Sequence, residues 1–213
     1  MAFPVILILL PLAALAFGGR RGGGAAPVGP WSDQTPPEPI HVGQRGDPEL
    51  ETLLSQMDAM FRSYGVKLDL IDAAEVTVMR KTNGYHAIPP KSYWPRMAAT
   101  IVYGFQPIRN ALKGPITVTS AYRPADYNEA VGGEEGSRHQ FFEALDMVAP
   151  SGMANKQALI AADLWIRSGT RIRMGLGVYG SPGSASNIHI DTGSSQRVWK
   201  NARDWIDRAK AQA

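Results

Sequence analysis

The chain has 213 residues, of which 44% are hydrophobic and 19% charged, a composition typical of a folded globular protein and not of a disordered or collagen-like chain. Its formal net charge is only +3 and it has no block of Lys and Arg, so nucleic acid is not an expected partner. The absence of cysteine excludes disulfides, cysteine nucleophiles and cysteine-bound zinc, which leaves histidines and carboxylates as metal ligands.

The N-terminal residues 1–19 are hydrophobic, and residues 2–17 carry no charge. Such a stretch has the length of the apolar part of a secretion signal and lies near the lower limit for a membrane-spanning helix. Arg20 and Arg21 follow the stretch instead of preceding it, which by the positive-inside rule places the following domain on the cytoplasmic side. An atypical export signal and a short membrane anchor are both open, and a buried apolar helix is the third alternative.

A Gly- and Pro-rich segment, residues 20–45, follows the hydrophobic stretch. Such a composition buries little apolar surface and predicts a flexible or extended linker. The folded domain is therefore expected over residues 46–213.

The first two helices of this domain are predicted by apolar residues at helical spacing. One helix is expected over residues 49–64, with Asp47 as its N-cap and Pro48 at its first position. The second is expected over residues 93–112, with a break or kink near Pro107, which has no backbone N–H to donate.

The second half of the domain alternates between short β-branched or apolar runs and helical patterns. Helices followed by strands mixed with a helix indicate an α+β fold with a small, mostly antiparallel sheet flanked by helices. Strands are expected at residues 76–79, 116–121, 144–148, 174–179 and 187–191, and further helices at 156–168 and 198–210.

Four histidines are available as candidate functional residues. His41 lies in the expected linker and His86 in a segment without clear periodicity. For these two, solvation or a local hydrogen bond is the favoured interpretation. The other two histidines have acidic residues at suggestive spacing.

A metal site is one interpretation of this spacing. Asp146 follows His139 by seven positions, and His189 lies in an expected strand with Asp191 on the same face, because side chains two apart in a strand point the same way. Two histidines and one carboxylate are a common protein ligand set for zinc, which then keeps its fourth position open for water. From spacing alone, a chance arrangement remains the alternative.

Ordered motifs surround these residues. The segment 120–146 contains SAYRP, a single Asn, AVGG and SRH in that order, and 174–199 contains MGLGVY and NIHIDTG followed by Arg197 and Trp199. This set resembles the signature of the M15 peptidases over about residues 105–200. These are zinc D-Ala-D-Ala carboxypeptidases and murein endopeptidases, including the endopeptidase K type, and they share a fold with the Hedgehog signalling domain.

The resemblance implies a role for five residues. His139, Asp146 and His189 fall on the three ligands of Zn²⁺ in the family. Arg123 falls on the arginine that pairs with a carboxylate of the substrate, which suits a guanidinium able to form two parallel hydrogen bonds. A surface ion pair is the alternative role for Arg123. Ser137 is expected to line the site or to cap the turn before it.

The sequence also departs from the family pattern. Phe142 stands where many members have glycine, and Ser186 stands where several members carry the acidic general base. Asp191 is then the first candidate for the general base, and orienting His189 is its alternative role. Glu143 is a weaker candidate for the same task.

By resemblance, the chain is expected to hydrolyse peptide bonds in the stem or cross-link peptides of bacterial peptidoglycan, as an endopeptidase or a D-Ala-D-Ala carboxypeptidase. The expected setting is the periplasm or cell envelope, with membrane contact through the N-terminal segment, and the role is either wall remodelling or that of a phage lysin or virion enzyme. A catalytically inactive peptidoglycan-binding module of the same fold is the alternative, and a Hedgehog-like or small-dipeptide hydrolase is a weaker one.

Overall fold

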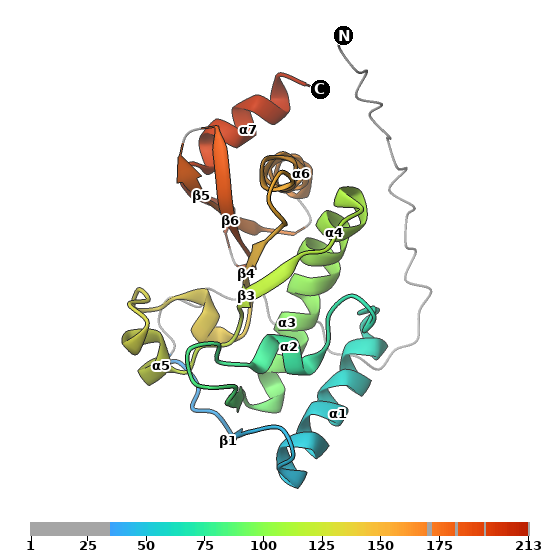
Figure 1. Cartoon of the computed structure of the whole chain (residues 1–213), viewed down its shortest axis with the longest axis vertical. Coiled ribbons are helices and arrows are strands. Elements are labelled where there is room, and N and C mark those ends of the chain that lie inside the picture. The colour runs from blue at the N-terminus through green and yellow to red at the C-terminus, as the bar shows by residue number, and fades with distance from the viewer. Residues whose placement is uncertain (1–34, 170–171, 182, 194, 213) are drawn as a thin grey trace.

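The structure, a computed structural model, describes residues 35–169, 172–181, 183–193 and 195–212 (Figure 1). The hydrophobic segment and most of the expected linker lie outside the described residues, and so do the predictions made for them. Within the described ranges, no helix combines the length and the apolar character needed to cross a membrane.

Ordered structure begins before the expected domain start at residue 46. Strand β1 (His41–Gly43) pairs in antiparallel register with β2 (His86–Ile88), and Ile40 N–H donates to Ile88 O at 2.8 Å. Neither three-residue strand carries an alternating pattern that could be detected without its partner. The pairing corrects the expected linker boundary at residue 45.

The first predicted helix is confirmed as α1 (Pro48–Ser63). The carboxylate of Asp47 accepts the backbone N–H groups of Glu49 and Leu50, as an N-cap does. One face of the helix is buried in the core through Leu50, Leu53, Leu54, Met57 and Phe61.

The expected strand at residues 76–79 is wrong, because this segment ends a short helix, α2 (Ala73–Thr77). Asp72 caps the helix by accepting the backbone N–H three residues ahead. Within residues 76–79, only Val78 pairs as a strand residue does, through a single antiparallel bridge with His86. A local cap therefore outweighs the β-branched composition of the segment.

The expected helix 93–112 is present as consecutive helical pieces: η1 (Lys91–Tyr93), α3 (Trp94–Thr100), the π-helical turn η2 (Ile101–Phe105) and α4 (Gln106–Leu112). The π turn ends at Phe105, two residues before Pro107, and this irregularity of the helix agrees with the break that the sequence predicts near this proline. Gly104 in this turn lets β6 approach, since a Cβ there would lie 2.6 Å from Ile190 Cδ1.

The remaining elements build a five-stranded sheet in the order β3-β4-β6-β5-β7. All neighbours are antiparallel except β5 and β7, which confirms the expected α+β fold with a mostly antiparallel sheet. The elements are β3 (Thr117–Ser120), α5 (Ala125–Ala130), the 3₁₀ turn η3 (Arg138–Phe141), β4 (Ala144–Val148), α6 (Ala154–Ser168), β5 (Met174–Ser181), β6 (Ser184–Thr192), β7 (Arg197–Lys200) and α7 (Ala202–Lys210).

The last predicted helix, 198–210, is wrong in its first turn. Residues Arg197–Lys200 form β7 and pair in parallel with β5, and α7 starts only at Ala202. The helical apolar pattern of α7 continues upstream by chance through Val198 and Trp199. Pairing with a distant strand decides the conformation of this stretch.

The two faces of the sheet have different compositions. One face is apolar and buried through Leu145, Met147, Leu176, Val178, Ile188 and Ile190. Helix α6 covers this face and packs on α4, as Figure 1 shows. The alternation of side chains along each strand turns the residues between these apolar positions to the opposite face. That opposite face carries the buried polar residues Asp146, His189 and Asp191.

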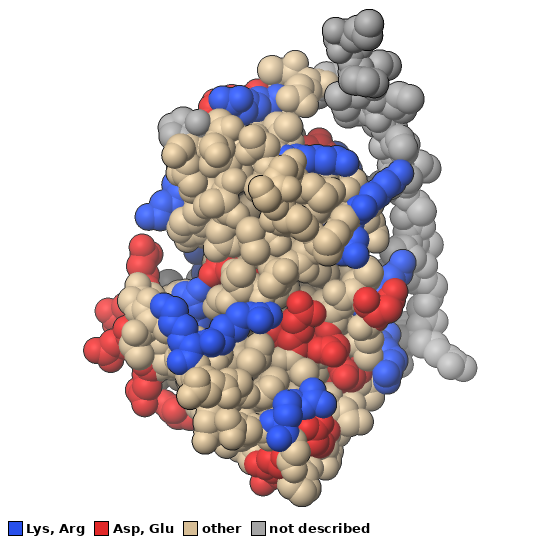
Figure 2. All heavy atoms as spheres, in the orientation of Figure 1, with Lys and Arg blue, Asp and Glu red and all other residues tan. Residues whose placement is uncertain are grey.

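Charged side chains of both signs are interspersed over the molecular face in Figure 2. Acidic side chains gather at its left edge, over α5 and the turn after it, where Asp126, Glu129, Glu134 and Glu135 are exposed. The small net charge of +3 thus arises from a mixture of acidic and basic groups.

Candidate metal centre

Three side chains converge on the polar face of the sheet. Asp146 in β4 and His189 in β6 are direct cross-strand partners, and η3 brings His139 beside them. All three residues are buried, and their candidate ligand atoms lie within 4.8 Å of one another. The predicted ligand set is therefore assembled from parts of the chain up to 50 residues apart.

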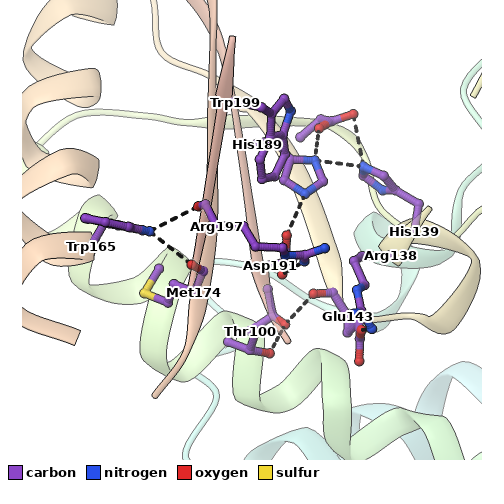
Figure 3. A network of polar contacts seen from close by, with 12 residues as sticks. Thr100, Arg138, His139, Glu143, Trp165, Met174, His189, Asp191, Arg197 and Trp199 are labelled. Atoms are coloured by element: carbon purple, nitrogen blue, oxygen red, sulfur yellow. Dashed lines mark hydrogen bonds and ion pairs between the residues drawn. The ribbon is translucent and has the colours of Figure 1, made fainter. Parts of the chain in front are cut away.

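The imidazole of His139 is held by the main chain. Its Nδ1 lies 2.6 Å from the carbonyl oxygen of Ala121, so Nδ1 carries the proton and donates it. The other nitrogen, Nε2, is then a free lone pair. It points at His189 Nδ1, 3.2 Å away (Figure 3).

The imidazole of His189 is held from its opposite side by a carboxylate. Its Nε2 lies 3.2 Å from Asp191 Oδ2, and its Nδ1 lies 2.8 Å from Asp146 Oδ1. With the proton on Nε2, the Nδ1 lone pair faces both His139 and Asp146. Asp191 therefore contacts the nitrogen of His189 that points away from the convergence point (Figure 3).

The electrostatics of the centre favour a positive charge between these groups. Burial alone would lower the pKa of His189, but the hydrogen bonds and charges of Asp146 and Asp191 outweigh it and raise the pKa to about 9. Burial would raise the pKa of Asp146, yet the two histidines hold it well below its usual range. Burial lowers the pKa of His139, which has a carbonyl and not a second carboxylate behind it.

This donor set fits a divalent cation. When His189 is neutral with its proton on Nε2, His139 Nε2, His189 Nδ1 and the Asp146 carboxylate present three lone-pair atoms to one point. A positive charge at this point stabilises the arrangement, and it can be a proton on His189 Nδ1, in line with the raised pKa of His189, or a bound cation. Two imidazoles and one carboxylate, with room for a fourth ligand, are the ligand type that Zn²⁺ takes in hydrolytic sites.

Arg123 lies at the edge of this centre, on the loop after β3. Its Nε donates to Ser120 Oγ at 2.7 Å, and its Nη2 donates to Asp146 Oδ2 at 2.5 Å. The predicted substrate arginine is therefore next to the predicted ligands. Ser137 directly precedes η3, and its carbonyl accepts the N–H of Gln140, so the structure places it in the turn that carries His139.

The two acidic candidates for the general base lie behind His189. Asp191 is fully buried and accepts a hydrogen bond from Arg197 Nη2 at 2.7 Å. Glu143 is also buried and pairs with Arg138 at 2.7 Å. Burial raises the pKa of Glu143 to about 7, although Arg138 opposes the shift. Figure 3 shows Glu143 and Arg138 beyond Asp191.

The other two histidines have local partners, as predicted. His41 Nε2 lies 2.9 Å from Asp47 Oδ2, and His86 Nδ1 lies 3.0 Å from Thr77 Oγ1. Neither belongs to the group that could bind a metal.

A family model described as Peptidase M15 matches residues 71–191, more than half of the chain. The chain belongs to the peptidase M15 family. The match includes all three converging side chains, and membership implies a hydrolase of the metallopeptidase class. The comparison with curated proteins gives no match.

One feature of this M15 peptidase explains its departure from the family pattern at residue 142. Phe142 has a left-handed backbone with φ 54°, a conformation in which glycine carries no penalty. Its ring is fully buried and packs edge-on against Tyr122, with centroids 5.7 Å apart. The burial of an aromatic ring offsets the backbone cost here.

Some contacts of the centre could not be found from the sequence. The carbonyl of Ala121 has no sequence signature, because every residue has one. The η3 turn is closed by a hydrogen bond from Glu143 N–H to the Arg138 carbonyl. This turn brings the side chains of Arg138 and Glu143 together, so their ion pair depends on the turn and not on a sequence motif. The only signal for Arg197 was its presence in the motif after the His189 strand.

Proposed function

We propose that this M15 family member is a zinc-dependent peptidase that hydrolyses peptide bonds in the stem or cross-link peptides of bacterial peptidoglycan. The observation that carries the proposal is the convergence of His139 Nε2, His189 Nδ1 and the Asp146 carboxylate in a peptidase fold. Endopeptidase and D-Ala-D-Ala carboxypeptidase action both fit this centre.

The chain's own residues prepare the centre for hydrolysis. A zinc ion held by His139, Asp146 and His189 would polarise a peptide carbonyl and lower the pKa of the attacking water. The Ala121 carbonyl fixes the tautomer and orientation of His139. Asp191 does the same for His189 from the opposite side, as hydrogen-bonded partners of metal-binding histidines do.

We assign Asp191 the orienting role and not that of the general base. Its two oxygens face His189 Nε2 and Arg197 Nη2, and its side chain has no exposed surface. A general base must reach the attacking water within hydrogen-bond distance. The geometry of Asp191 supports a role behind the ligand.

Arg123 is suited to bind a carboxylate of the substrate. Its guanidinium is already oriented by Ser120 and Asp146, and its side chain stays 16% exposed at the edge of the centre. Stem peptides of peptidoglycan carry carboxylates at terminal D-Ala and at diaminopimelate side groups. A planar guanidinium can grip such a group with two parallel hydrogen bonds. Ser137, in the turn before His139, would line the same edge.

The proposed substrate implies a place of action outside the cytoplasm. We propose the periplasm or the cell envelope, reached through the hydrophobic N-terminal segment as a signal or membrane anchor, or release onto the wall as a phage lysin or virion enzyme. Nucleic acid is not a proposed partner, in line with the mixed surface charge.

The test combines metal content with wall digestion. The full chain is purified, its zinc is measured by elemental analysis, and it is incubated with purified peptidoglycan whose fragments are identified by mass spectrometry. We expect about one zinc per chain and peptide fragments from the wild type, and neither from His189→Ala. His41→Ala is the matched control, because His41 contacts Asp47 and not the metal centre.

Two outcomes would decide against the proposal. A wild-type chain that takes up no zinc would refute the metal centre. A zinc-loaded chain that binds peptidoglycan without releasing fragments would instead support the non-catalytic wall-binding module.

A further inference from the structure

The carboxylate of Asp191 reaches across strand β5 to Arg197. Asp191 in β6 and Arg197 in β7 are both register partners of Gly175 in the strand between them. A Cβ on Gly175 would lie 2.1 Å from Asp191 Oδ2, so only glycine leaves room for this carboxylate. Across the gap, Arg197 Nη2 donates to Asp191 Oδ1 at 2.7 Å, while Oδ2 faces His189 Nε2 (Figure 3).

The next row of the same face repeats this arrangement with an aromatic ring. His189 and Trp199 are both register partners of Gly177. A Cβ there would lie 2.7 Å from Cε2 and Nε1 of the indole, so this glycine makes room for Trp199. The Trp199 and His189 rings meet edge-on with centroids 4.8 Å apart, and the indole N–H donates to the Tyr179 hydroxyl at 3.5 Å.

The charge of Asp191 requires a partner on β7. The carboxylate has no exposed surface, and a buried carboxylate is costly unless it is hydrogen-bonded and neutralised. A metal-binding His189 is a neutral ring and can supply only a hydrogen bond to it. Arg197, whose side chain is 36% exposed, supplies the positive charge. Without the positive charge of Arg197, the ionised carboxylate of Asp191 would be destabilised in the buried position from which it accepts the hydrogen bond of His189.

We propose that strand β7 is a positioning element for the third metal ligand: Arg197 and Trp199 reach over Gly175 and Gly177 to hold His189 through its far nitrogen and its ring. The inference rests on the proposed metal centre. Strand β7 thus contributes to the site through His189, although the side chains of Arg197 and Trp199 do not supply any of the three converging ligand atoms.

Zinc affinity of the full chain tests this role. Dissociation constants are measured by competition with a chromophoric chelator for the wild type, Arg197→Gln, Arg197→Lys, Gly175→Ala and Trp199→Phe. Removal of a partner behind a ligand weakens metal binding by about 10- to 100-fold, which we expect for Arg197→Gln and Gly175→Ala. Arg197→Lys keeps the charge and should recover part of the loss. Arg208→Gln is the matched control, since Arg208 pairs with Asp204 in α7.

A second readout separates positioning from general destabilisation. Urea unfolding of each metal-free variant gives its stability, and the absorption spectrum of bound Co²⁺ reports the geometry at the ligands. We expect an altered Co²⁺ spectrum in Arg197→Gln even under conditions where the variant is fully folded. Wild-type zinc affinity and an unchanged Co²⁺ spectrum in folded Arg197→Gln would overturn the inference. Absence of metal binding by the wild type would instead refute the underlying proposed function.

Discussion

At the scale of single residues, the candidate metal centre depends on which ring nitrogen of each histidine faces the point where the three side chains converge. His139 and His189 use different ring nitrogens, Nε2 and Nδ1, toward the same point. A carbonyl lies behind the ring of His139, and the carboxylate of Asp191 lies behind the ring of His189. The resemblance of the surrounding motifs predicted these residues as ligands, but the hydrogen-bond partners of their rings are neighbours that only the fold brings into contact.

Phe142 permits a prediction about two opposing residue-scale effects. Phe142→Ala removes a fully buried ring and should cost about 3–5 kcal/mol of unfolding free energy. Phe142→Gly loses the same ring but relieves the left-handed backbone, so it should be more stable than Phe142→Ala by about 1 kcal/mol. Chemical denaturation of the metal-free variants measures both differences. A glycine variant less stable than the alanine variant would contradict the backbone argument.

Arg123 gives a prediction about substrate recognition. Lysine at this position keeps the charge but loses the planar pair of donors. On a stem peptide with a free carboxylate, Arg123→Lys should lower kcat/KM by about 10-fold or more, because a charge-assisted hydrogen bond contributes roughly 1.5–3 kcal/mol. The control is the same peptide with that carboxylate amidated. Equal losses on both peptides would show that Arg123 acts on the centre and not on the substrate carboxylate.

At the scale of elements, caps and strand pairing decide where composition is ambiguous. Residues 76–79 have β-branched character, yet Asp72 accepts Glu75 N–H and Asp58 accepts Ala73 N–H, which begins helix α2. In the opposite direction, residues 197–200 extend a helical pattern, yet pairing with β5 makes them a strand. One error arose from a missed local signal and the other from a contact between distant parts of the chain.

The Asp72 cap can be tested directly. Asp72→Ala removes the acceptor of the Glu75 N–H and should destabilise the protein by about 1 kcal/mol. Asp72→Asn keeps a capping oxygen and should stay close to the wild type. Urea unfolding curves of the three proteins give the comparison. If both variants lose the same stability, the charge of Asp72 matters and the cap does not.

At the scale of the whole molecule, residues 35–45 belong to the fold. The hydroxyl of Tyr122, a buried residue, donates to the Pro37 carbonyl at 2.9 Å, and β1 pairs with β2. Tyr122 lies between Ala121, which holds His139, and Arg123. Residues 35–45 thus support the same stretch of chain that carries part of the centre.

We therefore expect a chain starting at residue 35 to be more stable than one starting at residue 46. The shorter chain leaves the Tyr122 hydroxyl without its partner, which costs about 1–3 kcal/mol, and also loses the pairing of β1. Thermal unfolding of both chains measures the difference. Tyr122→Phe in the longer chain isolates the share of the hydrogen bond. Equal melting temperatures for the two chains would contradict the role of the segment.

Zinc should stabilise the whole molecule through its ligands. Because the three candidate ligand side chains come from η3, β4 and β6, an ion that binds them only in the folded state would shift the unfolding equilibrium of the entire domain. At a free zinc concentration 100 times the dissociation constant, the gain is about 2.7 kcal/mol. Calorimetry with and without zinc measures it. His189→Ala should show no gain, and an equal gain in that variant would place the ion elsewhere.

The sequence by itself determined the class of the protein and its three candidate ligands. Ordered motifs, an N-capped amphipathic helix α1 and the β-branched strand β3 are local patterns, and local patterns can be read without a partner. Only the tertiary structure decided the β1–β2 pairing, the strand β7 and the neighbours that orient the two imidazoles. These depend on contacts between residues far apart in the chain, and the free energy of such contacts is absent from any short window of sequence.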